Sequence, residues 1–293
     1  MSGALKEVRN RIKSVQSTQQ ITKAMKMVSA AKLRRAQDAV TQMRPYAKKL
    51  QEMLSNIVSS SDGDVSMDLA AERPIEKVLI IVVTSDRGLC GGYNSNLIKL
   101  AKQLIKEKYE RQDDKGNVQV LPIGKKGYEY FTKNGFKVVN TYWDIFSDLR
   151  FERVQAAAKY AMDAFANKEF DAVEVIYSEF KNAASQTYIA EPFLPVQKVA
   201  KSENNKKSDF IFEPNQQVLI EELMPKILNT QLYKAVLDAN ASEHGARMTA
   251  MDKASDNANE LLKSLKISYN RARQAAITTE LTEIVSGAAA LQG

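Results

Sequence analysis

Residues 248–276 read MTAMDKASDNANELLKSLKISYNRARQAA, and this stretch decides the fold. Apolar or small residues recur in it at steps of three and four, a period typical of a helix packed along one partner helix. No proline lies between Lys226 and Ser286, so the helix is expected to run well beyond the quoted stretch. The recurring positions are Met248, Met251, Ser255, Ala258, Leu262, Leu265, Tyr269, Ala272 and Ala276.

The start of the chain carries the same spacing and supplies the partner helix. The pattern predicts a slip of register around residues 21–28, which changes the supercoil locally without ending the helix. The two ends of the chain are therefore expected to form a long antiparallel coiled coil, with everything between them inserted. The predicted seam positions are Leu5, Val8, Ile12, Val15, Ile21, Met25, Val28, Ala36, Val40, Met43, Ala47, Leu50, Leu54 and Ile57.

The two terminal helices differ in length, and the difference predicts a projecting end. The first is expected over residues 4–57, roughly 80 Å at about 1.5 Å per residue. A partner that begins near Gln216 would pass the end of the first helix at around residue 270 and continue to about residue 287. An apolar stripe continues there, so we expect another chain to enclose this tip. The stripe consists of Ile277, Leu281, Ile284 and Ala288.

Between the two helices, short apolar runs alternate with helical patterns. Strands are predicted over residues 78–83, 118–123, 137–142, 172–177 and 188–194, and helices over 95–109, 127–133 and 150–167. This alternation is typical of a mostly parallel sheet covered on both faces. The predicted fold is α/β, with terminal coiled-coil helices (residues 1–58 and 214–293) around an inserted Rossmann-like α/β domain (residues 77–200).

Composition excludes several classes of protein. The longest apolar run, residues 78–83, is far too short to span a bilayer, so no transmembrane span is expected. Cys90 is the only cysteine, which excludes an internal disulfide and favours a reducing compartment. No leader or transit segment is recognisable at the start, and we expect a soluble cytosolic protein.

The N-terminal helix is strongly basic. Residues 1–50 contain twelve Lys or Arg against Glu7 and Asp38, whereas the whole chain has a net charge of +7. Such a helix fits nucleic acid, anionic lipid, an acidic protein surface, or simply a solvated face. Tyr46 is the only aromatic residue in the stretch, which argues against nucleic acid.

The loop of residues 84–94, TSDRGLCGGYN, is the candidate enzyme site, because it follows a strand and opens a helix. It matches neither the dinucleotide fingerprint nor the P-loop pattern. Cys90 is expected to be buried and inert, and His244 to lie on a helix surface. No metal-ligand spacing occurs, and no cofactor is expected. A nucleotide-binding α/β enzyme dimerised by its terminal helices remains the alternative.

Five motifs resemble one family, the gamma subunit of F-type ATP synthases. Residues 277–290, ITTELTEIVSGAAA, are similar to its C-terminal signature. The others are ITKAMKMV at 21–28, SDRGLCGG at 85–92, ARMTAM at 246–251 and YNRARQ at 269–274. The resemblance spans the whole chain and is strongest at both ends.

The resemblance implies a non-catalytic rotor at the cytoplasmic face of the bacterial inner membrane. It turns between the proton-driven c-ring and the alpha and beta subunits, and it also contacts the epsilon subunit. It implies beta-subunit contacts at Lys23, Met25, Lys26, Arg247, Arg273, Gln274, Thr278 and Glu280. The tip residues Ile277, Leu281, Ile284 and Ala288 would sit in an apolar sleeve. The implied foot, near the c-ring or the epsilon subunit, comprises Phe210, Phe212 and Glu213.

Overall fold

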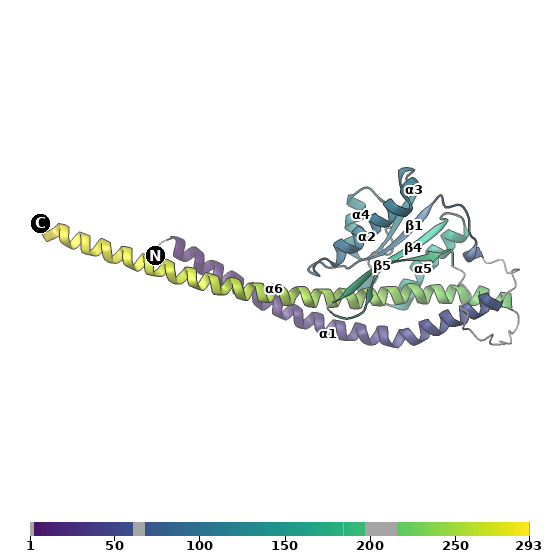
Figure 1. Cartoon of the computed structure of the whole chain (residues 1–293), viewed down its shortest axis with the longest axis horizontal. Helices are drawn as coiled ribbons and strands as arrows, with labels where there is room; N and C mark the ends of the chain where they lie inside the picture. The colour runs from purple at the N-terminus through teal and green to yellow at the C-terminus, as the bar shows by residue number, and fades with distance from the viewer. Residues whose placement is uncertain (1–2, 61–67, 184, 197–215, 293) are drawn as a thin grey trace. The chain divides into compact units, whose positions relative to one another are not determined.

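The computed structural model describes residues 3–60, 68–183, 185–196 and 216–292 (Figure 1). The chain forms two compact units. Met1–Ser29 and Met248–Gly293 make up the first, which we call the coiled-coil unit. Ala30–Arg247 make up the second, the α/β unit. Two helices, α1 (Gly3–Ser60) and α6 (Gln216–Gln292), contribute to both, which confirms the two long terminal helices.

Polar contacts set the register of the helix pair in the coiled-coil unit. Thr22 Oγ1 lies 2.7 Å from Ser255 Oγ, and Lys26 Nζ lies 2.5 Å from Asp252 Oδ1. The residue numbers in these pairs add to a nearly constant value, so the helices are antiparallel, as predicted. The predicted seam of α6 is buried at Met251, Ser255, Ala258, Leu262 and Leu265.

The predicted slip around residues 21–28 is wrong. Ile21 and Val28 are 56% and 57% exposed, while Thr22 and Ser29 are buried. The seam of α1 keeps its spacing by using small polar residues. These are tolerated because the Thr22 hydroxyl bonds with Ser255 and the Ser29 hydroxyl donates to the carbonyl of Met25. A sequence pattern based on apolar residues alone therefore places the seam at Ile21 and Val28, which are the exposed neighbours of Thr22 and Ser29.

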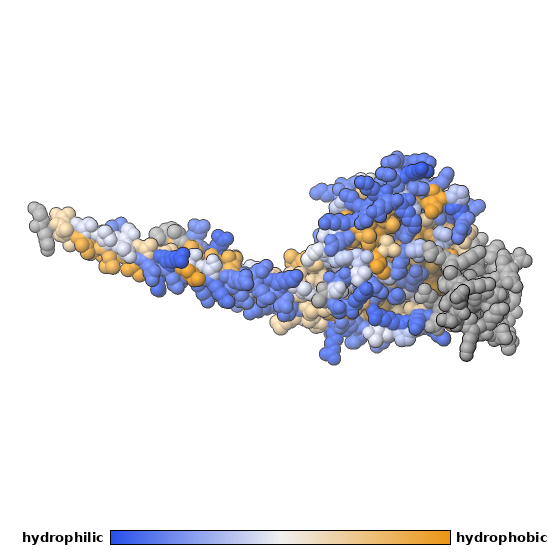
Figure 2. Space-filling model, in the orientation of Figure 1, coloured by the Kyte–Doolittle hydropathy of each residue, from blue (hydrophilic) through white to orange (hydrophobic). Residues whose placement is uncertain are grey.

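The C-terminal end of α6 extends past the N-terminal end of α1, as the difference in helix length predicts. The register places Leu5, which is buried, level with about residue 273 of α6. Every side chain from Ile277 to Leu291 is exposed. Figure 2 shows hydrophobic residues recurring along this part of α6. The helix ends at Gln292, later than predicted, because Ala288, Ala289 and Ala290 are strong helix formers.

The α/β unit contains one five-stranded sheet of order β3-β2-β1-β4-β5. Strands β1 (Val78–Val83), β2 (Val118–Ile123), β3 (Lys137–Val138) and β4 (Ala172–Phe180) are parallel. Strand β5 (Gln186–Leu194) is antiparallel to β4. The mostly parallel sheet is therefore confirmed. The third strand is shorter than predicted, because the chain leaves the sheet after Val139, which still donates to the carbonyl of Val120.

Helices cover both faces of the sheet. In β1, Val78, Ile80 and Val82 face α2 (Tyr93–Lys108) and α4 (Lys125–Lys133). Alternate residues of the strand face α5 (Phe151–Ala166) and α6, where Leu228, Leu232 and Val236 are buried. Thus α6 is itself a layer of the α/β core. The remaining elements are α3 (Glu110–Asp114), which was not predicted, and the 3-10 turns η1 (Asp68–Ala70) and η2 (Ile145–Asp148).

Candidate functional site

The loop of residues 84–94 supplies the acceptors for the N-terminus of α4, the helix that follows β2. The first three N–H groups of α4 donate to Asp86 Oδ1 at 3.0 Å, the carbonyl of Ser85 at 3.0 Å and Thr84 Oγ1 at 2.8 Å. In phosphate-binding α/β folds such N–H groups hold the anion. At α4, acceptors of the loop after β1 fill these N–H groups, so the start of α4 does not bind a phosphate.

Cys90 belongs to the packing of the same loop. The Asn94 side chain accepts from Ser85 N at 2.9 Å and donates to Ser85 Oγ at 2.7 Å, which closes the loop over the thiol. Cys90 is 2% exposed, and burial raises the pKa of its thiol. The thiolate is therefore disfavoured, and the prediction of a buried cysteine is confirmed.

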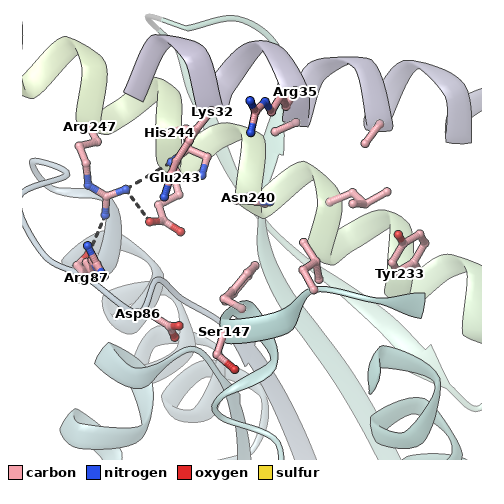
Figure 3. A pocket seen from close by; sticks show the side chains of 15 residues that line it. Lys32, Arg35, Asp86, Arg87, Ser147, Tyr233, Asn240, Glu243, His244 and Arg247 are labelled. Carbon is pink, nitrogen blue, oxygen red and sulfur yellow. Dashed lines mark hydrogen bonds and ion pairs between the residues drawn. The ribbon is translucent and has the colours of Figure 1, made fainter. Parts of the chain in front are cut away.

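Arg247 ties α6 to the loop that follows β1. Its guanidinium lies 2.6 Å from Glu243 Oε1 and donates to the carbonyl of Arg87 at 2.8 Å and of Gly88 at 3.3 Å (Figure 3). Both partners of the Arg247–Glu243 pair are at least nine-tenths buried. Most donors of Arg247 are thus used inside the α/β unit, so this residue has a structural role in linking α6 to the loop.

His244 is held neutral beside this pair. Burial, with the charges of Arg247 and Lys32, lowers its pKa to about 4. Arg247 Nη1 approaches His244 Nδ1 at 3.4 Å, and because a guanidinium can only donate, Nδ1 must accept. The imidazole proton therefore lies on Nε2. His244 is only half-buried, and it lines a cleft of about 900 Å³ rather than an open helix surface.

The beta-contact residues implied by the family resemblance lie in both units. In the coiled-coil unit Lys23 is exposed, Met25 is half-buried, and Lys26 is paired with Asp252. Further along α6, Arg273, Gln274, Thr278 and Glu280 are all exposed, beside or beyond the start of α1. Arg247 lies in the α/β unit. The predicted foot residues Phe210, Phe212 and Glu213 lie outside the described residues.

Sequence reasoning missed the residues that surround Arg247. Glu243 stands four positions before Arg247 on one helix, a spacing that indicates an ion pair and could have been recognised. Lys32, Arg35 and Arg87 also line the cleft, yet no sequence signal brings these three together. Within the described ranges, no cluster of three or more His, Cys, Asp or Glu side chains could hold a metal ion. None of the described helices is long and apolar enough to span a bilayer.

Asp238 and His244 give the α/β unit opposite responses to pH. The Asp238 carboxylate is fully buried and lies 3.8 Å from Arg44. Burial raises its pKa to about 6. Between pH 4 and 6 the folded state therefore binds more protons at Asp238 than the unfolded chain, so this residue lowers stability as pH rises. His244, with its lowered pKa, raises stability over the same interval.

We predict that Asp238→Asn stabilises the α/β unit at pH 7 by about 1–3 kcal/mol and gives no gain near pH 4. His244→Gln should remove the contribution of His244, which raises stability with pH. The variant should therefore lose stability as the pH rises from 4 to 6. Urea unfolding at several pH values, followed by the fluorescence of Trp143, measures both. Parallel pH profiles for Asp238→Asn and the parent chain would contradict the assignment.

Two terminal helices that pair with each other around an inserted α/β unit define the class of this protein. A family model described as ATP synthase matches residues 4–291. The ATP synthase gamma chain of Cytophaga hutchinsonii is 53% identical over 291 residues, covering 98% of this chain and 99% of its own. That of Flavobacterium psychrophilum is 50% identical over 289 residues, covering 99% of each chain. The chain belongs to the ATP synthase gamma chain family.

A solved structure agrees with the fold. A chain in the mitochondrial ATP synthase of Euglena gracilis aligns with a TM-score of 0.68 at 20% identity, covering 99% of this chain and 95% of that one. At this identity the likeness concerns the fold alone. The expected fold, long terminal helices around an α/β domain, and the family resemblance are therefore both confirmed.

Proposed function

We propose that the chain is the central-stalk rotor of an F-type ATP synthase. It transmits torque between the c-ring and the catalytic ring of alpha and beta subunits, coupling proton transport to ATP synthesis and regulating ATPase activity. The observation that carries the proposal is the C-terminal end of α6, exposed from Ile277 onward, in a chain whose family match runs from end to end. The alternative of a nucleotide-binding enzyme is not favoured, because the relatives that match this chain over nearly its whole length are ATP synthase gamma chains.

We further propose partner subunits and a cellular location for the chain. The chain would contact the alpha, beta and epsilon subunits and the c-ring at the cytoplasmic face of the bacterial inner membrane. It would have no catalytic residue of its own and would bind no nucleic acid. The segments 1–58, 77–200 and 214–293 remain our proposal for its domains. Copurification from membranes, with identification of the bound chains, tests the role; recovery of the chain without alpha and beta subunits would contradict it.

The exposed apolar stripe of α6 is the proposed bearing surface. Ile277, Leu281 and Ile284 are 49%, 57% and 67% exposed and recur on one side of the helix. Ala288 continues the stripe and is exposed as well. A lone helix with such a stripe is stabilised when another surface buries it. An apolar sleeve formed by the catalytic ring would bury the stripe and still let a nearly cylindrical helix turn.

We predict that Arg273→Ala combined with Gln274→Ala impairs ATP synthesis or assembly by about tenfold or more. Both side chains are exposed at the end of the helix pair, and losing one side of a charged contact costs a few kcal/mol. ATP synthesis in inverted membrane vesicles measures the effect. The matched control is Lys263→Ala with Lys266→Ala, two exposed residues where α6 is paired within its own chain. Equal damage by the control pair would show that the tip has no special role.

The Lys26–Asp252 pair allows a test of the proposed contact near Met25. We predict that Lys23→Glu lowers coupling between ATP hydrolysis and proton pumping several-fold, because an acidic beta-subunit surface would meet a reversed charge. Lys26→Glu combined with Asp252→Lys reverses the other charge while keeping the ion pair, and it should lower coupling too. Proton pumping in vesicles, normalised to ATP turnover, is the measurement. Unchanged coupling in both variants would mean that this face is simply solvated.

A further inference from the structure

The α/β unit contains a cleft that the rotor role does not use. It has a volume of about 900 Å³ and is bordered by α1, α6, η2 and the loop that follows β1 (Figure 3). Pockets of this size hold small molecules. The cleft is therefore large enough for a ligand beyond a bound ion.

The topology places the cleft where sheets of this type bind ligands. Strand β1 lies between β2 and β4, and the chain passes through β2 and β3 before it returns to β4, so the strand order reverses beside β1. Ligands of open α/β sheets bind outside the carboxyl ends of the strands at this reversal. Asp86 and Arg87, which line the cleft, follow the carboxyl end of β1 directly.

One end of the cleft carries more positive than negative charge. Lys32 and Arg35 come from α1 and Arg87 from the loop, and their side chains form no ion pair or hydrogen bond with any described residue. Of the two carboxylates present, Glu243 is taken by Arg247 and Asp86 by the first N–H of α4. The lining thus holds four cations against two carboxylates, and this net positive charge suits a multivalent anion. Guanidinium groups bind phosphate in a bidentate manner.

The other end of the cleft is apolar. Tyr233 lies at the end opposite Arg87 and Arg247 in Figure 3, and its ring is held edge-on against Phe151 at 5.2 Å. Further apolar lining comes from Phe146, Leu149 and Leu237. A bare inorganic anion would leave this wall in contact with water, whereas a ligand with an apolar or aromatic body would cover it.

We propose that this cleft binds a small organic phosphate, with its phosphate groups at Lys32, Arg35 and Arg87 and its body against the wall around Tyr233. The donors are side chains from α1 and the loop, unlike the helix N–H groups of a P-loop. The proposal uses contacts within the α/β unit only and does not depend on the rotor role.

Calorimetry on the full chain at about 0.15 M salt tests the proposal with ADP, pyrophosphate and adenosine as probes. ADP should bind in the micromolar range, at least about tenfold more tightly than pyrophosphate, and adenosine most weakly. Lys32→Ala with Arg35→Ala should weaken ADP at least about tenfold. Tyr233→Leu should weaken ADP and leave pyrophosphate unchanged. Unaltered Trp143 fluorescence in each variant serves as the check that the unit remains folded.

Arg34→Ala is the matched control, because Arg34 is exposed on the same turn of α1 and does not line the cleft. An equal loss of ADP affinity in this control would overturn the proposal in favour of general attraction to a basic helix. Pyrophosphate binding as tight as ADP would overturn the assigned apolar wall. No ADP binding below about 1 mM, an affinity of about 4 kcal/mol, would overturn the site itself.

Discussion

Gly124→Ala is expected to destabilise the α/β unit by about 4 kcal/mol or more, which places it among the rare severe substitutions. Gly124 adopts φ +105°, and a Cβ atom there would lie 2.3 Å from the carbonyl oxygen of Thr84 and 2.6 Å from its carbon. Backbone atoms cannot move aside as a flexible side chain would. The clash falls where β1 runs into the loop and where Gly124 N donates to the carbonyl of Trp143.

Trp143 is the only tryptophan and stacks on Tyr128 at 5.4 Å, so its fluorescence reports on this corner of the unit. Gly135→Ala is the control, because Gly135 also has a positive φ of +79° but no atom lies within 4 Å of a Cβ placed there. It should cost only about 1 kcal/mol, the strain of the backbone conformation alone. Similar losses in the two variants under urea unfolding would mean that the close approach to Thr84 has no consequence.

Arg247→Ala should cost about 3–5 kcal/mol, the second large effect. The substitution leaves the Glu243 carboxylate buried without its counter-charge and frees the carbonyls of Arg87 and Gly88. Burial already raises the pKa of Glu243, and Arg247 is the main group that opposes this rise. Without Arg247 the pKa of Glu243 should climb further, and the variant should regain stability as the pH is lowered toward full protonation of Glu243.

A double-mutant comparison separates the energetic contribution of the Arg247–Glu243 ion pair from that of the hydrogen bonds between Arg247 and the loop. Glu243→Gln together with Arg247→Ala should be less destabilised than Arg247→Ala alone, because no charge is left buried. Arg247→Lys should recover only part of the loss, since an ammonium group cannot reach two carbonyls and a carboxylate with a planar fork. The expectation fails if Arg247→Ala unfolds at the same urea concentration as the parent chain.

The long helices and the sheet could be predicted because their patterns are repetitive and local. A seam at steps of three and four identifies a paired helix wherever it occurs, and six consecutive apolar residues identify the buried strand β1. The same reasoning failed where polar residues, rather than apolar ones, occupy the seam. Thr22 and Ser29 occupy the seam as satisfied hydroxyls, which an apolar template does not recognise.

The surroundings of Arg247 could not be predicted, because they join residues far apart in the chain. Lys32, Arg87 and Arg247 share one cleft only after β1 has placed its loop and α6 has packed on the sheet. The basic character of residues 1–50 gave the charge of this region but no ligand, since a charge count carries no geometry. Likewise, the burial that moves the pKa of Asp238 and His244 comes from contacts across elements.

The sequence by itself determined the two terminal helices, their antiparallel pairing, the strand–helix alternation and the excess length of α6, since each follows from local periodicity or from counting residues. Only the tertiary structure decided that α6 forms one layer of the α/β core, that the N–H groups of α4 are filled by the loop after β1, and that Lys32, Arg35 and Arg87 line one cleft with Tyr233. Those features depend on which surfaces meet, and that choice is made by burial of the whole chain at once.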